Sequence, residues 1–376
     1  MKKLLIVTRW YLPAVKSGGT VRSLIALVDR LKDSFDIIII TSDRDLGAVE
    51  PYKNIEFDTL IRKDGIGIIY LSSINVSNMH KYMKMINPDI LYINSFFDIT
   101  TQSIMVLKLL KLIKADIILA PRGELAFGAL SIKPTKKKIY LTIYKLLNMS
   151  KNITFHATSK EDLSDIKKIF PSNNIEIIQN LKEENKNQSI LPYKNRDSLK
   201  IVFISRIAPV KNLHYALSIL KDTKIEESLI FDIYGPIEDK DYWLRCQQIF
   251  ADMPDNITIS YKGFVEPSMI QSTLGKYHLF FLPTKGENFG HAIVEAMQVG
   301  LIPLISNKTP WQDLESFTAG FSLSLENPDS FSTAIRKVAQ FDNEEFLIVS
   351  ENVKKYITQK VNSDETLEKY KIFFNK

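Results

Sequence analysis

The sequence predicts an α/β protein made of two doubly wound domains, each with a parallel sheet covered by helices on both faces. Short, almost uninterrupted apolar segments alternate with amphipathic ones along the chain, which is the pattern of parallel strands joined by helices. A length of 376 residues is long for one hydrophobic core and natural for two. We therefore expect two domains with a cleft between them, and ligands at the carboxyl ends of the strands.

The first domain is expected over residues 1–182. Its opening strand is Leu4–Thr8, and a helix follows the glycine pair Gly18-Gly19 and runs to Lys32. Apolar residues recur every three or four positions in that helix, which is the period of a face packed on a sheet. Further strands are expected at Asp36–Thr41, Gly67–Leu71, Asp89–Asn94, Asp116–Ala120, Ile153–Ala157 and Glu176–Gln179.

The second domain is expected over residues 199–355, after a polar linker at 183–198 that lacks any apolar period. Its strands are expected at Lys200–Ser205, Leu229–Tyr234, Ile257–Tyr261, Leu279–Pro283, Ile302–Ser306 and Phe321–Leu325. Its helices are expected at Lys211–Lys221, Asp239–Ala251, Ser268–Lys276 and Asp329–Gln340. The last segment, residues 356–376, is charged and helical and ends in aromatic residues.

The composition excludes several classes of protein. Apolar residues make up 45% of the chain and charged residues 24%, as in soluble globular proteins. A single cysteine, Cys246, rules out a disulfide framework, and the five histidines show no metal-ligand spacing. No apolar run is long enough for a spanning helix or a signal peptide. We expect a soluble, cytoplasmic protein without a metal site.

The net charge of +6 is concentrated in one part of the first domain. Between Met105 and Lys151, ten basic residues face only two acids, which gives this stretch a net charge of +8. Leucine and isoleucine are interleaved with the lysines, as in helices that carry a basic face. The favoured interpretation is that Lys108–Lys151 adheres to anionic lipid, at about 1 kcal/mol per charge. A solvated face is the main alternative, and nucleic acid binding is the least favoured one.

The segment Leu279–Gly300 carries the strongest chemical signal. A short apolar strand leads into a polar loop with a glycine, and a helix follows from Phe289–Gly290 to Gly300. Backbone N–H groups at a helix start favour an anionic or hydroxyl-rich ligand. Because carboxylates accept hydrogen bonds from a diol, Glu287 in the loop and Glu295 in the helix indicate a ligand with sugar hydroxyls as well as phosphate. The alternative is a capped helix with an exposed glutamate.

Two cations follow the first strand of the second domain. Arg206 lies at the end of that strand, and Lys211 comes five residues later, where the next helix opens. Both should lie at the carboxyl edge of the sheet, near Glu287. An arginine fork and a lysine point charge could hold a diphosphate between them. Alternatively, Arg206 pairs with a local acid and Lys211 is a surface residue.

Glycine turns mark other strand ends. Gly235 follows one strand of the second domain, and Phe264 and Val265 follow the next, in turns that bring the backbone close to a planar base. In the first domain, Gly18 and Gly19 allow a ligand to approach the start of a helix. The dinucleotide fingerprint G-x-G-x-x-G is absent there, which disfavours an NAD-dependent enzyme.

Three polar residues of the first domain are candidates for contacts with a second substrate. Arg122 and Glu124 follow the strand that ends at Ala120, and a substrate role and a structural ion pair are equally supported. His156 lies near the end of another strand, although a lone histidine is more often a core residue with its hydrogen bonds satisfied.

With these features the chain resembles the retaining glycosyltransferases of the GT-B fold, the large family 4 group that uses nucleotide-sugar donors. The resemblance covers essentially the full length. Its most specific element is the E-x7-E pattern of Glu287 and Glu295, and its second element is the R-x4-K pair of Arg206 and Lys211. It implies two Rossmann-like domains and a C-terminal helix that returns to the first domain.

The resemblance also implies a role for each motif. Arg206 and Lys211 would bind the donor diphosphate and stabilise the leaving nucleoside diphosphate, so no metal or other cofactor is expected. Glu295 would bind the ribose hydroxyls, and Gly19 would approach the phosphate. The residues implied in holding the donor sugar are Glu287, Asn288, Phe289, Gly290 and His291.

Two departures from the family concern the acceptor. Many relatives have a histidine at the strand end where this chain has Arg122, so any contribution of that histidine is absent or transferred to Arg122. An Asn-Gly pair often found before the linker is Asn180-Leu181 here.

The Glu-Asn-Phe-Gly-His segment and Thr309-Pro310-Trp311 resemble the bacterial branch that builds O-antigen and capsule. The resemblance implies transfer of a hexose or N-acetylhexosamine from a nucleoside-diphosphate sugar, expected to be UDP-linked. The acceptor would be a lipid-linked glycan at the cytoplasmic face of the cell membrane, where the protein would be peripheral.

Other functions remain open on the same fold. A sugar-nucleotide 2-epimerase would need further acid–base side chains in the cleft. A phosphorylase of the best-known type would need a lysine that bears pyridoxal phosphate. An inactive subunit that only binds the nucleotide sugar is disfavoured by four intact residues: Arg206, Lys211, Glu287 and Glu295.

Overall fold

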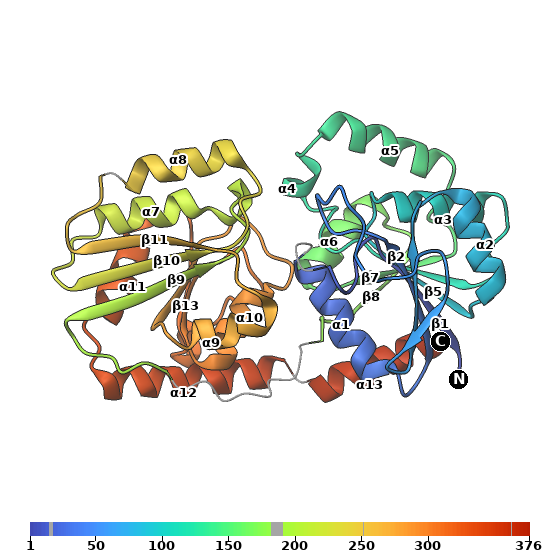
Figure 1. The fold of residues 1–376 in the computed structure, drawn as a ribbon. Coiled ribbons are helices and arrows are strands. Elements are labelled where there is room, and N and C mark those ends of the chain that lie inside the picture. The colour runs from blue at the N-terminus through green and yellow to red at the C-terminus, as the bar shows by residue number, and fades with distance from the viewer. Residues whose placement is uncertain (15–17, 182–190, 251, 362) are drawn as a thin grey trace. The chain divides into compact units, whose positions relative to one another are not determined.

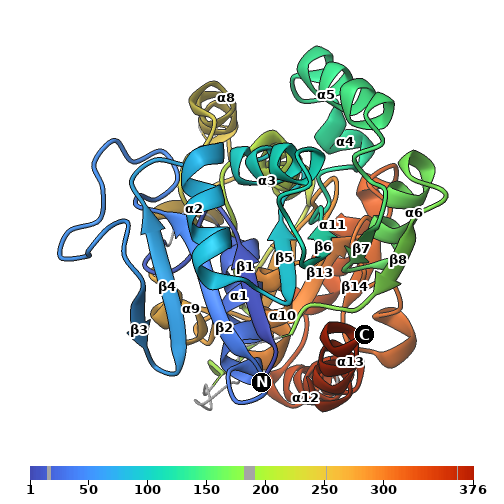
Figure 2. The same ribbon diagram turned by 90° about the vertical axis from the view of Figure 1, so that its right-hand side faces the viewer.

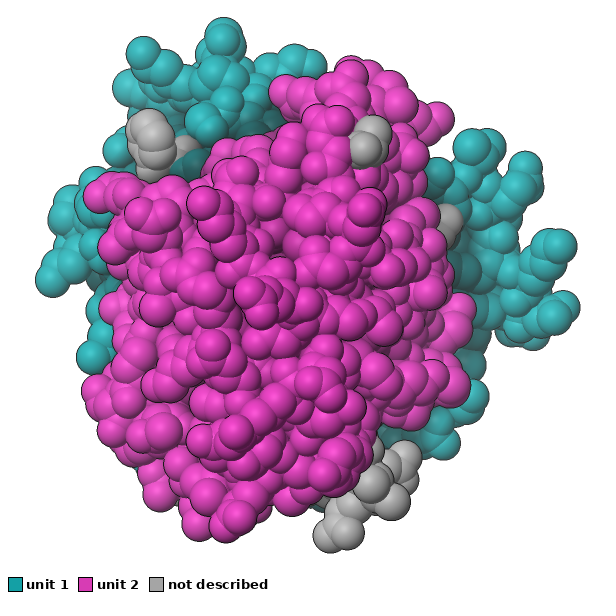
Figure 3. All heavy atoms as spheres, turned by 90° about the vertical axis from the view of Figure 1, so that its left-hand side faces the viewer, with its two compact units in different colours: residues 1–183, 363–376 teal, residues 184–362 magenta. Residues whose placement is uncertain are grey.

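The computed structural model describes residues 1–14, 18–181, 191–250, 252–361 and 363–376, which form two compact units. Unit 1 comprises Met1–Glu183 and Ser363–Lys376, and unit 2 comprises Glu184–Asn362. Figure 1 shows their elements, and Figure 3 shows them in separate colours. The predicted linker at 183–198 overlaps residues 182–190, which lie outside the described part of the chain. Strands and helices alternate in both units, and the predicted α/β fold class is confirmed.

Unit 1 is built on an eight-stranded sheet with the order β3-β4-β2-β1-β5-β6-β7-β8. Neighbouring strands are parallel, except that β3 pairs antiparallel with β4. The edge strand β3 is short and two of its three residues are charged, so no apolar run indicates it in the sequence. The strands are β1 (Lys3–Val7), β2 (Asp36–Ser42), β3 (Ile61–Lys63), β4 (Ile66–Leu71), β5 (Ile90–Asn94), β6 (Asp116–Ala120), β7 (Ile153–Ala157) and β8 (Asn174–Ile177).

Helices cover both faces of this sheet (Figures 1 and 2). Along β1, Leu5 and Val7 belong to one buried apolar cluster, and Leu4 and Ile6 belong to another. Because both faces of the strand are buried, its sequence is an unbroken apolar run. The helices are α1 (Gly19–Leu31), α2 (Val76–Ile86), α3 (Ile99–Leu109), α4 (Phe127–Leu130), α5 (Pro134–Leu146), α6 (Lys160–Ile169) and α13 (Ser363–Asn375).

The C-terminal helix α13 packs on unit 1. Its aromatic residues Tyr370, Phe373 and Phe374 are buried in the same cluster as Leu4 of β1. The ring of Phe374 lies 5.3 Å from that of Tyr92 in β5, in an edge-to-face arrangement. Burial of each aromatic side chain contributes about 1.5–3 kcal/mol, so this end of the chain is an integral part of the first core.

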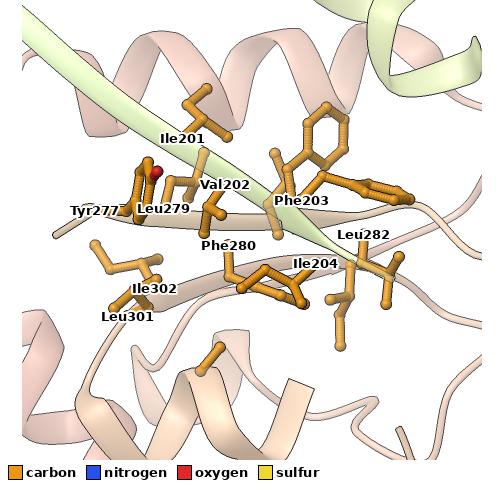
Figure 4. Packing of buried hydrophobic residues seen from close by; sticks show 14 of the residues in the cluster. Ile201, Val202, Phe203, Ile204, Tyr277, Leu279, Phe280, Leu282, Leu301 and Ile302 are labelled. Carbon is orange, nitrogen blue, oxygen red and sulfur yellow. The ribbon is translucent and has the colours of Figure 1, made fainter. Parts of the chain in front are cut away.

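Unit 2 has a six-stranded parallel sheet with the order β11-β10-β9-β12-β13-β14. Figure 4 shows side chains of its two central strands packed together, among them Phe203 and Phe280, which are fully buried. The strands are β9 (Ser198–Ile204), β10 (Ser228–Tyr234), β11 (Ile257–Gly263), β12 (Leu279–Leu282), β13 (Ile302–Ser306) and β14 (Phe321–Leu323). The α-helices are α7 (Leu213–Asp222), α8 (Lys240–Phe250), α9 (Ile270–Leu274), α10 (His291–Val299), α11 (Pro328–Ala339) and α12 (Asn343–Lys360).

Candidate active site

The loop after β9 places Arg206 at the carboxyl edge of the unit 2 sheet. Gly235, at the end of β10, has a φ of +136°, and a Cβ there would lie 1.9 Å from Ser205 O. Only glycine allows this approach of two backbones. Ser205 N donates to Tyr234 O (3.1 Å) and Gly235 N donates to Gly263 O (2.8 Å), so the ends of three strands are joined. The position of Arg206 therefore depends on packing that Gly235 permits.

Arg206 forms an ion pair with Glu238 in the loop after β10. The two side chains are 40% and 47% exposed, so the pair is well solvated and contributes about 1 kcal/mol or less. The local acid considered as an alternative for Arg206 is thus present. An anionic ligand could displace this carboxylate at small cost, because the contact is exposed. Sequence reasoning did not identify Glu238, although its place three residues after Gly235 puts it at the same sheet edge.

Lys211 and Glu287 form a second ion pair, with side chains only 12% and 14% exposed. Lys211 ends the short 3-10 helix Pro209–Lys211, and Glu287 lies in the loop after β12. These two loops are joined by hydrogen bonds from Lys285 N to Val210 O (2.8 Å), from Thr284 Oγ1 to Val210 O (3.1 Å) and from Asn212 Nδ2 to Pro283 O (2.9 Å). The proximity that the sequence predicts is confirmed as a direct contact.

The ion pair leaves binding capacity on Lys211. An ammonium group has three N–H donors, and the contact with Glu287 uses one of them. Because the pair is largely removed from water, the carboxylate also holds the ammonium group in one place. A phosphate oxygen next to Lys211 would meet a cation that is already oriented, which is the arrangement that favours charge stabilisation.

The start of α10 is fixed by an aromatic cluster. Phe289 is buried, and its ring centroid lies 4.8 Å from that of His291 and 5.7 Å from that of Trp311. Trp311 Nε1 donates to Phe289 O (2.8 Å). Gly290 precedes the helix with a φ of +77°, a left-handed conformation that favours glycine. The helix therefore begins at His291, slightly later than predicted, and the N–H groups of its first turn have no partners within the helix.

The remaining predicted residues of unit 2 lie around the same edge. Asn288, His291 and Glu295 are half-buried along the loop and the first turns of α10. After β11, Phe264 is 43% exposed and Val265 packs against the core. An exposed aromatic ring at a strand end can stack on a planar base. Unit 2 thus presents two cations, a carboxylate, a helix start and an aromatic ring along one edge of one sheet.

In unit 1, the predicted glycines mark the start of α1. Gly18 precedes the helix with a φ of +71°, and Gly19 is its first residue. A Cβ built on Gly18 would meet nothing within 4 Å in the described part of the chain. Contact of this backbone with the donor phosphate stays a prediction.

Neutral groups hold Arg122 at the carboxyl edge of the unit 1 sheet. Its Nε and Nη2 donate to Asn94 Oδ1 (3.0 and 2.8 Å), and Nη2 also donates to Tyr92 OH (2.9 Å). Its Nη1 donates to Asn180 Oδ1. Asn180 is the asparagine of the family's Asn-Gly pair, whose glycine is replaced by Leu181 in this chain, and it helps to fix Arg122. Tyr92 and Asn94 lie inside β5 and carry no sequence signal for this role.

Glu124 holds a backbone loop in place, a role that the sequence did not predict. It accepts hydrogen bonds from Ser95 Oγ (2.7 Å), Phe96 N (2.6 Å) and Phe97 N (3.0 Å). In the described part of unit 1, it forms no ion pair with Arg122. Its carboxylate fixes the loop between β5 and α3, and a contact with substrate stays a prediction.

His156 is fully buried, so this structure does not support the predicted contact with an acceptor. Its Nδ1 lies 2.7 Å from Tyr92 OH, and its Nε2 lies 2.9 Å from Ile178 O. Since Tyr92 OH accepts from Arg122, its own hydrogen is donated to Nδ1, and Nε2–H is donated to the carbonyl. His156 therefore positions Arg122 through Tyr92. Burial and the nearby guanidinium lower the pKa of His156 to about 3.

This histidine should make stability depend on pH. Between its folded pKa of about 3 and its ordinary value of 6.5, the unfolded chain binds a proton that the folded protein does not bind. Its contribution is complete above pH 6.5 and is lost as the pH falls toward 3. Between neutral pH and about pH 4.5, His156→Gln should lose less stability in urea unfolding than the wild type, by about 1–3 kcal/mol. Equal losses would contradict a neutral His156.

Sequence comparison gives two matches. Residues 182–358, which cover most of unit 2, match the family described as glycosyl transferases group 1. The chain is also 21% identical over 258 residues to an uncharacterized 41.2 kDa protein in the cps region of Klebsiella pneumoniae. That alignment covers 66% of this chain and 68% of the Klebsiella protein.

Solved structures share the whole architecture at low sequence identity. Sucrose-phosphate synthase from Thermosynechococcus elongatus matches with a TM-score of 0.75 and 12% identity, over 100% of this chain and 98% of that one. HepE from Anabaena, in complex with UDP and glucose, gives 0.70 and 13% identity over 100% of both chains. TarM from S. aureus, in complex with UDP and other ligands, gives 0.71 and 14% identity over 100% of both chains. At these identities the likeness establishes the fold.

Proposed function

Because this chain has the GT-B fold and residues 182–358 match the group 1 glycosyl transferases, we propose that it is a retaining glycosyltransferase of the family 4 type. It transfers a hexose or N-acetylhexosamine from a UDP-linked sugar to a lipid-linked glycan. The family match and the fold support a glycosyltransferase that acts on a nucleotide sugar. The observation that carries the proposal is the pairing of Lys211 with Glu287 at the edge of the unit 2 sheet where Arg206 also lies.

The two cations stabilise the leaving group. As the bond between sugar and phosphate breaks, negative charge develops on the diphosphate, and preformed positive charge lowers the barrier. Lys211, held by Glu287, supplies a fixed point charge. Arg206 exchanges the exposed carboxylate of Glu238 for a phosphate oxygen, which its planar guanidinium can bind through two N–H groups.

The other residues at the carboxyl edge of the unit 2 sheet bind the sugar and the nucleoside of the donor. Glu287 and the segment from Asn288 to His291 hold the sugar hydroxyls, Glu295 binds the ribose, and Phe264 lies against the base. In a same-face reaction the donor phosphate takes the proton of the acceptor, so no separate general base is needed. In the described residues, no three His, Cys, Asp or Glu side chains gather where they could hold a metal ion. Independence from metal remains a prediction.

The acceptor is proposed from two observations. A relative lies in a cps region, which supports a role in capsule-type polysaccharide synthesis. The basic stretch of unit 1 supports work at the cytoplasmic face of a membrane that carries the lipid-linked acceptor. Among the helices that the structure describes, none combines the length and apolar character needed to cross a bilayer. The membrane association in this proposal uses the basic stretch of unit 1.

The proposal can be tested with a panel of nucleotide sugars and a lipid extract that contains polyprenyl-linked glycans. We expect one UDP-sugar to release a nucleoside diphosphate when acceptor is present. Without acceptor, only slow background hydrolysis of the donor should occur. The linkage in the product, determined by NMR, should keep the donor's anomeric configuration. An epimerised sugar nucleotide, sugar 1-phosphate formation or binding without turnover would each assign a different function and contradict the proposal.

A further inference from the structure

A groove of about 790 Å³ lies on unit 2, along the outer face of α12. One wall is α12 itself, which runs along the lower side of unit 2 in Figure 1, and the other is the segment around Tyr193. Its apolar lining is exposed: Tyr193, Leu347 and Ile348 are 76%, 48% and 56% exposed. Aliphatic and aromatic side chains that are exposed together around one groove indicate a surface that binds another macromolecule.

The charged residues of the groove are mostly acids. Asp342, Glu344 and Glu351 line it against a single lysine, Lys355, so the lining has a net charge of −2 on a chain whose net charge is +6. Acids near the start of a helix suit its dipole, which accounts for Asp342 and Glu344. The dipole does not account for Glu351, which lies in the third turn of α12, or for the apolar side chains beside it. The groove is therefore an acidic, partly apolar surface on a basic protein.

The backbone that carries Tyr193 is fixed, although the side chain is exposed. Tyr193 O lies 3.3 Å from His278 Nε2. The next residue, Lys194, is fully buried, and its backbone N donates to Asn343 Oδ1 (3.1 Å) while its Nζ donates to Ala339 O (2.7 Å). This segment is thus tied to the end of α11 and the start of α12. Because its backbone is already ordered, covering the Tyr193 ring costs little conformational entropy, which is a property of the aromatic anchors of interfaces.

We propose that this groove binds a basic amphipathic helix of a partner protein. Apolar residues of that helix contact Tyr193, Leu347 and Ile348, as in other helix-in-groove interfaces. Its lysine or arginine residues face Glu344 and Glu351, and this charge complementarity selects the partner and speeds the encounter. A second copy of the chain docked groove to groove fits less well, because two linings of the same negative charge repel each other.

The docking groove lies away from the candidate active site. The opposite face of α12 is buried in the core of unit 2, through residues such as Phe346 and Val353. Tyr193 lies next to His278, which immediately precedes β12, so the groove is near the amino edge of the sheet. Arg206 follows β9 at the carboxyl edge. A partner in the groove therefore leaves the donor site open, and the inference does not rest on the proposed function.

Fluorescence anisotropy with the full-length protein and labelled peptides tests the proposal. One peptide of about 18 residues contains leucine and lysine at helical spacing, and a second has the same composition in an order without that spacing. Glu344→Gln/Glu351→Gln removes the acids of the groove, and Leu347→Ser/Ile348→Ser removes apolar contacts without a change of charge. The matched control is Asp252→Asn/Asp255→Asn, because these exposed acids lie between α8 and the edge strand β11, and α12 packs near β13.

We expect wild type and control to bind the amphipathic peptide at least about tenfold more tightly than the reordered one, and both test variants to lose about tenfold in affinity. Thermal midpoints and slow donor hydrolysis should be unchanged in all variants. The proposal is overturned if either test variant binds like the control, or if wild type does not distinguish the two peptides. It is also overturned if sedimentation without peptide shows wild-type dimers that the test variants lose, because the groove would then bind a second copy.

Discussion

Replacing Lys211 by alanine should reduce sugar transfer by about 100- to 1000-fold, because it removes a preformed positive charge from the leaving diphosphate. Arg206→Ala should have a loss of the same order. The measurement is the initial rate of nucleoside diphosphate release by purified protein with saturating donor and acceptor. Normal turnover in either variant would contradict the assignment of these residues.

Two further variants separate catalysis from stability. Lys211→Ala leaves Glu287 largely desolvated without its partner, so the folded state should also be destabilised. In Lys211→Ala/Glu287→Ala the stability should recover in part while transfer stays lost. Lys276→Ala is the matched control, because this exposed lysine precedes β12 at the opposite edge of the sheet and should transfer at the wild-type rate.

Among glycine-to-alanine substitutions in the described part of unit 2, Gly235→Ala should reduce the free energy of unfolding the most. The added methyl group would lie 1.9 Å from Ser205 O, and the φ of +136° is strained for any residue with a Cβ. We expect a loss of about 2–5 kcal/mol in the free energy of unfolding, measured with urea. Since the affected carbonyl precedes Arg206, the folded fraction should also bind donor more weakly.

A matched glycine makes this result specific. Gly286 lies in the loop next to Glu287, its φ is not in the left-handed region, and a Cβ there meets nothing within 4 Å. Gly286→Ala should therefore change stability by about 0.5 kcal/mol or less. Equal stability of the two variants would show that the packing at Gly235 does not fix the end of β9.

The central strands could be predicted because their sequences reflect burial on two faces. β1 and β12 are nearly unbroken apolar runs. The side chains of β1 are divided between two buried clusters, and all four residues of β12 are buried in the core of unit 2. The edge strand β3 has one apolar residue in three, so its pairing depends on the adjacent β4 and not on its own pattern. The start of α10 lies one or two residues later than predicted, because Gly290 precedes the helix in a left-handed conformation.

The site could be predicted as a set of residues but not as a set of contacts. Parallel strands bring their carboxyl ends to one edge, so Arg206 and Lys211 had to lie near Glu287. Which acid each cation contacts depends on loops that meet from distant parts of the chain, as Lys211 and Glu287 do across 76 residues. The burial of His156 likewise depends partly on Tyr370 of α13, which lies 214 residues later in the sequence. No local pattern contains that information.

Calorimetric titration with UDP and with uridine tests the central claim most directly, because it needs neither the donor sugar nor the acceptor. The claim is that Arg206 and Lys211 bind the diphosphate of the donor. Wild-type protein should bind UDP at least about 100-fold more tightly than uridine, and Lys211→Ala should reduce that ratio by about tenfold or more. If Lys211→Ala and Arg206→Ala both keep the wild-type preference for UDP, the diphosphate is bound elsewhere and the account is wrong.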